Sequence, residues 1–209
     1  MKPCEAAREI LKVTERPPGG APGFAPYHVS EALLTIDREP GVGRPRLQRR
    51  LGLGEAATRT LMQRLVLAGL AERIGRGLKL TNLGEELLSS ISKSIAIYQL
   101  DEPLVDEWGD TRAVLVGGVP PPRTLTDVYR FRDYLVEEGC RTAVVAGLDG
   151  DNVQAPGLPD YLRDRLASLL LQSIGAPTMG LLLVIPSECL ASAVNAALRI
   201  LASSCSETG

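Results

Sequence analysis

The stretch GVGRPRLQRRLGLGEAATRTLMQRLVLAGLAERIGRGLKLTNLGEELL, residues 41–88, decides the fold of the first half of the chain. It divides into a short Arg-rich helix at residues 44–51, a glycine turn, a longer helix at 55–68, a small hairpin and a further helix. This order of elements predicts a helix-turn-helix followed by a wing, a shape whose second helix enters the major groove of DNA.

Glycines and apolar spacing define the limits of these elements. Gly52 ends the first helix and Gly69 the second, because glycine readily takes the left-handed conformation that follows a helix. Residues 71–74 and 78–81 alternate like two strands, with a Gly-Arg-Gly turn at residues 75–77 between them. The second helix is expected to bury Thr58, Leu61, Met62, Leu65 and Ala68. The helix capped by Asn82 is expected to bury Leu83, Leu87, Leu88, Ile91 and Ile95.

Charge divides the chain into a basic half and an acidic half. The whole chain has 23 Lys and Arg against 25 Asp and Glu, a net charge of −2. Residues 1–100 hold 15 basic and 10 acidic side chains, whereas residues 101–209 hold 8 and 15. The basic excess is greatest at residues 44–79, where nine basic residues stand against two acidic ones. This asymmetry predicts two domains with different partners, the basic one with nucleic acid.

The residues expected to contact double-stranded DNA lie on the two helices and the wing. If the apolar face of the second helix is buried, Arg59, Thr60, Gln63 and Arg64 face outward, where Arg suits guanine and Gln suits adenine. Basic residues of the first helix are expected to hold phosphates, and the wing tip to reach the minor groove or flanking backbone. The full predicted set is Arg44, Arg46, Arg49, Arg50, Arg59, Thr60, Gln63, Arg64, Arg76 and Lys79.

The sequence divides into three segments. Residues 1–26 are expected to form a flexible arm, with a short helix at 4–14 before the Pro- and Gly-rich run ERPPGGAPGFAP. Residues 27–100 form the winged helix with a linker helix, and begin with a helix at 29–36 for which Ser30 is the candidate N-cap. Residues 101–209 form a second domain for sensing or dimerisation.

The second domain is predicted to be a two-layer α+β sandwich, so that the whole protein belongs to the α+β class. Strands are expected at residues 113–116, 142–148, 153–155 and 180–185, and helices at 125–138, 159–173 and 188–202. This β-α-β-β-α-β-α order fits an antiparallel sheet with helices on one side. The run Asp-Gly-Asp-Asn at 149–152 predicts a hairpin turn, although its oxygens also suit a hard cation.

No catalytic, cofactor or metal site is expected. The four cysteines form no C-x-x-C pair, His28 is the single histidine, and no G-x-x-x-x-G-K-[ST] phosphate loop occurs. No apolar run reaches the roughly 20 residues that span a bilayer, and MKPCEAAREILK lacks the apolar region of a signal peptide. A cytoplasmic protein that is not an enzyme and does not enter membranes is therefore predicted.

Two runs resemble known regulators. LQRRLGLGEAATRTLMQRLVLAGLAER with GLKLTNLGEELL resembles the winged-helix core of many bacterial and archaeal transcription regulators. Together with GFAPYHVSEALLTI and the α+β second half, the chain resembles a small archaeal two-domain family that is known as a domain of unknown function. The resemblance implies a two-domain layout and a regulatory role, and it supplies no reaction or ligand.

The sequence thus favours a DNA-binding transcription regulator whose second domain binds a small-molecule effector or forms a homodimer. Two alternatives remain at this stage. One is a winged helix used for protein contacts, and the other is an enzyme with its site in the acidic half.

Overall fold

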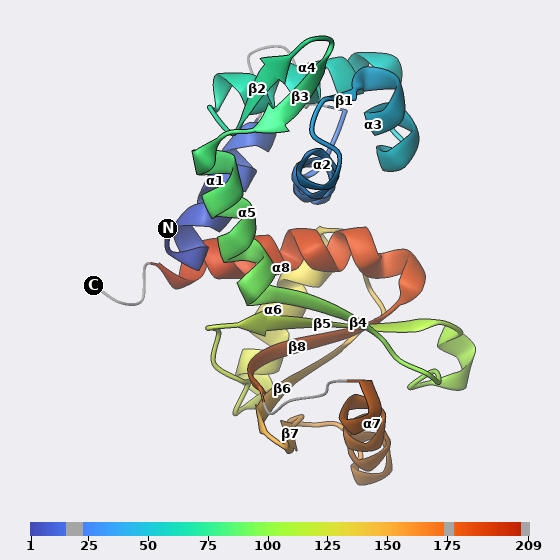
Figure 1. Ribbon diagram of the computed structural model, residues 1–209. Helices are drawn as coiled ribbons and strands as arrows, with labels where there is room; N and C mark the ends of the chain where they lie inside the picture. Colours follow the sequence, from blue (N-terminus) through green and yellow to red (C-terminus); the bar gives the residue numbers. More distant parts are fainter. Residues whose placement is uncertain (16–22, 174–177, 206–209) are drawn as a thin grey trace. The chain divides into compact units, whose positions relative to one another are not determined.

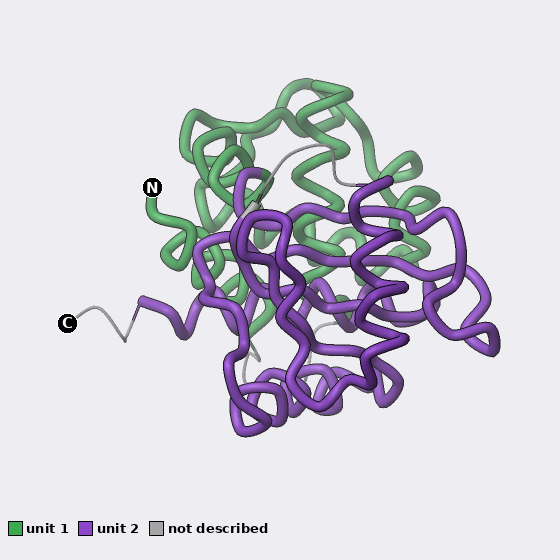
Figure 2. Tube along the Cα trace, turned by 90° about the horizontal axis from the view of Figure 1, so that it is seen from below, with its two compact units in different colours: residues 1–92 green, residues 93–209 purple. Residues whose placement is uncertain are grey.

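The computed structural model describes residues 1–15, 23–173 and 178–205, so residues 16–22, most of the Pro- and Gly-rich run of the predicted arm, lie outside the described residues. The chain divides into two compact units, Met1–Ser92 and Lys93–Gly209, coloured separately in Figure 2. The two units are described in turn.

The N-terminal unit combines helices with a small sheet. Strand β3 lies between β1 and β2 and pairs with both in the antiparallel sense. The elements, labelled in Figure 1, are α1 (Pro3–Thr14), α2 (Pro26–Arg38), β1 (Val42–Gly43), α3 (Arg44–Leu51), α4 (Glu55–Leu67), β2 (Ala71–Ile74), β3 (Gly77–Leu80) and α5 (Asn82–Ser94). The helices and the hairpin expected within residues 41–88 are all present, and β1 is an additional short strand.

The start of the chain is more ordered than expected. Helix α1 contacts α2 and α4, and its Ala6, Ala7 and Ile10 are buried, so this segment is part of the N-terminal core and not a flexible arm. Helix α2 begins at Pro26, three residues before the predicted start, because proline is favoured in the first turn of a helix. Ser30 is therefore not the N-cap. It lies inside α2, where its hydroxyl donates to the Pro26 carbonyl.

Four of the five residues predicted to form the buried face of α4 are buried. Thr58, Leu61, Met62 and Leu65 are covered, whereas Ala68 follows the end of α4 and is exposed. At the start of α5 the predicted cap is shifted by one residue, because the hydroxyl of Thr81 accepts a hydrogen bond from the Gly84 amide at 3.1 Å.

The C-terminal unit is built on one five-stranded sheet with the order β4-β5-β8-β6-β7, in which every neighbouring pair is antiparallel. The hairpin predicted at residues 149–152 is confirmed, since Asp149 pairs with Asn152 across a two-residue turn. The elements are β4 (Ile95–Gln99), β5 (Thr111–Gly117), α6 (Leu125–Glu137), β6 (Val144–Gly150), β7 (Asn152–Gln154), α7 (Asp160–Ser173), β8 (Thr178–Pro186) and α8 (Leu190–Ser204). The predicted α+β class is consistent with this mixture of helices and antiparallel sheet.

Two expectations for this half are wrong. Strand β4 pairs along its length with β5, so residues 95–99 belong to the C-terminal unit, and Ile95 starts a strand instead of ending the apolar stripe of α5. The sheet is also not covered on one side only. Helix α7 packs its Leu166 and Leu169 against one face, where Leu182 lies, while α6 and α8 contact the sheet from the other face (Figure 1).

Candidate functional site

The turn between α3 and α4 fixes the direction of α4. Gly52 ends α3 in the left-handed conformation with φ of +64°, which glycine adopts without a steric penalty. Two residues later Gly54 precedes α4, and its carbonyl accepts a hydrogen bond of 2.9 Å from the buried Thr58 hydroxyl. Together with the buried face of α4, this contact determines which side chains of the helix reach solvent.

The open side of α4 carries an arginine and a glutamine one helical turn apart. Arg59 and Gln63 are exposed and make no hydrogen bond or ion pair with any residue that the structure describes. Thr60 is half-buried, and its hydroxyl donates to the Ala56 carbonyl at 3.0 Å within the same helix. Arg59 and Gln63 therefore have all their donors available for a ligand.

Arg64 does not face outward as expected. Its guanidinium donates to the carbonyl of Val13 at 2.7 Å and to that of Glu15 at 2.9 Å, at the C-terminal end of α1. It also lies over the ring of Phe24, with 5.7 Å between the guanidinium carbon and the ring centroid. Carbonyls at a helix C-terminus lack partners inside the helix, so Arg64 supplies the missing donors. Its role here is structural.

Arg64→Ala is expected to lower the free energy of unfolding of the N-terminal unit by about 2 kcal/mol, because two carbonyls lose a charged donor. Arg59→Ala, on the same helix but without an internal partner among the described residues, should change it by less than about 0.5 kcal/mol. Urea unfolding followed by circular dichroism measures both. Equal effects of the two substitutions would refute the structural role of Arg64.

Three of the basic residues predicted to contact DNA are engaged in ion pairs. The pairs are Arg44 with Glu55 at 3.1 Å, Arg46 with Glu39 at 2.7 Å, and Lys79 with Glu72 at 2.9 Å. The hydrogen bond from Arg46 lowers the pKa of Glu39, and the same bond raises the pKa of Arg46. The pKa of Lys79 is raised by its hydrogen bond to Glu72. All six side chains are exposed, and exposed pairs contribute little stability, so exchange of a carboxylate for a phosphate costs little.

The β2–β3 hairpin presents two further arginines. Ile74 pairs with Gly77, and Gly75 takes a φ of +56° in the tight turn that exposes Arg76 at the tip. Arg73, on β2, is exposed as well and is not among the predicted contacts, because alternation from the buried Ala71 places it on the inner face of the strand. Neither arginine has a hydrogen-bond or ion-pair partner within the described part of the chain.

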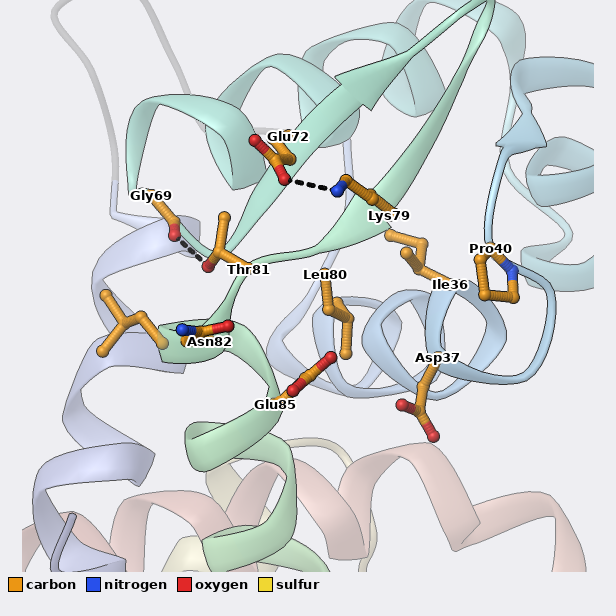
Figure 3. A pocket seen from close by; sticks show the side chains of 11 residues that line it. Ile36, Asp37, Pro40, Gly69, Glu72, Lys79, Leu80, Thr81, Asn82 and Glu85 are labelled. Atoms are coloured by element: carbon orange, nitrogen blue, oxygen red, sulfur yellow. Dashed lines mark hydrogen bonds and ion pairs between the residues drawn. The ribbon is translucent and has the colours of Figure 1, made fainter.

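A cavity of about 570 Å³ lies where the hairpin meets α2 and α5, and it is acidic (Figure 3). Asp37, Glu72 and Glu85 line it, and the one basic side chain in the lining, Lys79, is paired with Glu72. The Thr81 hydroxyl donates to the Gly69 carbonyl at its edge, as Figure 3 shows. A negatively charged surface repels phosphate, so nucleic acid is not expected to contact this cavity.

The residues that could supply other chemistry have structural surroundings. The Nδ1 of His28 accepts a hydrogen bond from the Ala25 amide at the start of α2, and burial lowers the pKa of this histidine. Burial raises the pKa of Cys140 to about 12, which keeps its thiol protonated. Across residues 1–15, 23–173 and 178–205, no three His, Cys, Asp or Glu side chains are grouped so as to hold a metal ion. Nor does any described helix have the length and apolar character to cross a membrane.

Comparisons with known proteins identify a protein of similar fold but indicate no activity. No family model and no curated protein matches the chain. Among solved structures, the chain is similar to the hypothetical protein PH0730 from Pyrococcus horikoshii OT3, with a TM-score of 0.59. The sequences are 18% identical, and the match covers 88% of this chain and 95% of the other. At this identity the similarity shows a shared fold across both units.

Proposed function

We propose that the N-terminal unit is a winged helix that binds double-stranded DNA, and that the protein is a transcription regulator. The observation that carries the proposal is the pair Arg59 and Gln63, exposed on the open side of α4 and free of internal partners among the described residues. Arginine and glutamine are the side chains that pair with guanine and adenine edges in the major groove. Helix α3, the turn and α4 then form the helix-turn-helix, and β2 and β3 form the wing.

In the proposed interface, one set of residues contacts base edges and another contacts phosphates. Arg59 and Gln63 read bases, while Arg73 and Arg76 of the wing contact the flanking backbone. The net charge of the N-terminal unit favours DNA binding, since residues 1–92 hold 14 basic and 10 acidic side chains, a net of +4. Arg64 is not part of the proposed interface, because its guanidinium is hydrogen-bonded to backbone carbonyls at the end of α1.

The proposal gives the C-terminal unit a role in dimerisation or effector binding. Residues 93–209 hold 9 basic and 15 acidic side chains, a net of −6, which disfavours contact with DNA. In a homodimer two copies of α4 would meet half-sites about 34 Å apart, one turn of the duplex. Cytoplasmic localisation belongs to the same proposal, because DNA is the partner.

DNA binding is tested with the full chain and a duplex selected from a random pool. Arg59→Ala is expected to weaken binding to the selected duplex by ten- to a hundredfold and binding to random duplex much less, since a lost base contact costs about 1–3 kcal/mol. Arg76→Ala should weaken binding to both duplexes equally. It should also reduce the slope of log affinity against log salt concentration by about 0.9, the contribution of one phosphate contact. Fluorescence anisotropy between 50 and 200 mM salt measures affinity and slope.

Arg132→Ala is the matched control. It removes the same charge from an exposed position on α6, and Arg132 has no internal partner in the described ranges. If the control weakens binding as much as Arg59→Ala, or if the selected duplex binds no better than a random one, the proposal fails.

A further inference from the structure

A second cavity, of about 400 Å³, lies between α2 and α3. Its lining includes four arginines and two glutamates, an excess of two positive charges. The residues that line it are Glu31, Leu34, Thr35, Arg38, Glu39, Arg46, Arg49 and Arg50. It differs from the acidic cavity of Figure 3 in charge, although both are lined by residues of α2.

One glutamate of this lining is already neutralised. Arg46 donates to the two carboxylate oxygens of Glu39 at 2.7 and 3.0 Å, a bidentate pair. The other three arginines, Arg38, Arg49 and Arg50, are exposed and form no hydrogen bond or ion pair with other described residues. Glu31 is the second glutamate of the lining, so a net of two positive charges is left for a bound anion to balance.

The cavity lies on the side of α3 that is turned away from α4. Arg44, at the start of α3, pairs with Glu55 at the start of α4 and so marks one flank of the helix. Arg46 pairs with Glu39 directly after α2 and marks the opposite flank, and Arg50 follows it by one helical turn. The residues that line the cavity include none from α4, which carries the proposed base-reading pair.

We infer that the cavity between α2 and α3 is a binding site for a phosphate group. A guanidinium fork matches the geometry of phosphate oxygens and can form two parallel hydrogen bonds with them, and three such forks line the cavity. The phosphate can come from a DNA backbone or from a free phosphorylated small molecule, since both present the same oxygens. The inference goes beyond the proposed function, because it holds for either source.

The site is tested by titrating inorganic phosphate, and separately pyrophosphate, into the full chain by isothermal calorimetry, with sodium chloride at equal ionic strength as the reference. The Arg38→Gln/Arg50→Gln double variant is expected to raise the Kd for both anions at least tenfold, since glutamine keeps a hydrogen-bond donor but loses the charge. Both positions are exposed and form no hydrogen bond or ion pair with other described residues, so the variant should fold, which circular dichroism verifies. Arg132→Gln, at an exposed position on α6, is the matched control and should leave both Kd values unchanged.

DNA binding by the same double variant identifies the source of the phosphate. A salt slope reduced by about two indicates backbone phosphates in the cavity, because each phosphate contact contributes about 0.9. An unchanged slope with lost phosphate binding indicates a free anion. If phosphate does not bind the natural chain at millimolar concentration, or binds the double variant equally well, the inference is wrong. This result is independent of Arg59→Ala, which tests DNA recognition alone.

Discussion

Gly77→Ala should destabilise the N-terminal unit by at least about 3 kcal/mol, one of the largest effects expected for a single methyl group in this protein. Gly77 lies in the central strand β3, opposite Gly43 of β1. An added Cβ would overlap the carbonyl of Gly41 and lie 2.7 Å from the carbonyl oxygen of Val42. Because the obstructing atoms are backbone, they cannot move without breaking the pairing of β1 with β3.

The matched control for this substitution is Gly54→Ala. Gly54 has an ordinary backbone conformation with φ of −68°, and a Cβ there meets no atom within 4 Å. Its expected cost is below about 1 kcal/mol, the difference between glycine and alanine next to a helix N-terminus. Urea unfolding of each variant, followed by far-ultraviolet circular dichroism, compares the two. Similar midpoints for both variants would show that the sheet tolerates a side chain at position 77.

Leu182→Ala should cost the C-terminal unit about 2–5 kcal/mol, the range found when a buried leucine is truncated. Leu182 has no exposed surface, and β8 is the middle strand of the sheet. Its side chain belongs to the cluster that also contains Leu166 and Leu169 of α7, so truncation leaves a cavity between sheet and helix. The surrounding side chains are expected to relax only partially into that space.

Leu171→Ala provides the comparison, because the same atoms are removed from a side chain that is 65% exposed on α7. Its expected effect is within about 0.5 kcal/mol. Trp108, the single tryptophan, packs against the cluster that contains Leu182, so its fluorescence during urea unfolding reports on this core. A loss below 1 kcal/mol for Leu182→Ala would mean that the core collapses around the missing side chain.

The helices of the N-terminal unit could be predicted because their limits are set by local chemistry. Gly52 and Gly69 follow the helices α3 and α4 directly or within two residues, and both have positive φ. Strand β1 could not be predicted in the same way. It is two residues long and is defined by its pairing with β3, more than thirty residues later in the chain.

The start of the C-terminal unit shows how a local pattern can mislead. Ile95 continues the helical spacing of Leu87, Leu88 and Ile91, so periodicity alone extends α5 through it. Pairing of Ile95 with Val116 decides otherwise, and such pairing overrides a local preference. A sequence pattern did indicate that helices cover both faces of the sheet. The unbroken apolar run at residues 181–185 is typical of a strand buried on both sides.

Helical spacing was sufficient to place Arg59 and Gln63 of the candidate site in solvent. The same spacing put Arg64 outside, but its partners are carbonyls 51 and 49 residues earlier in the chain, a relation that only the packing of α1 beside α4 creates. Backbone carbonyls are present in every residue, so no sequence pattern indicates which of them an arginine will bind.

The last turn of α2 separates two regions of opposite charge. Asp37 lines the acidic cavity, and the next residue, Arg38, lines the basic one. A surface divided in this way has a directional field, which rotates an approaching polyanion before contact. The consequence is kinetic. Encounters that begin on the acidic side are rejected early, so the association rate with a polyanion should depend on ionic strength more steeply than the dissociation rate does.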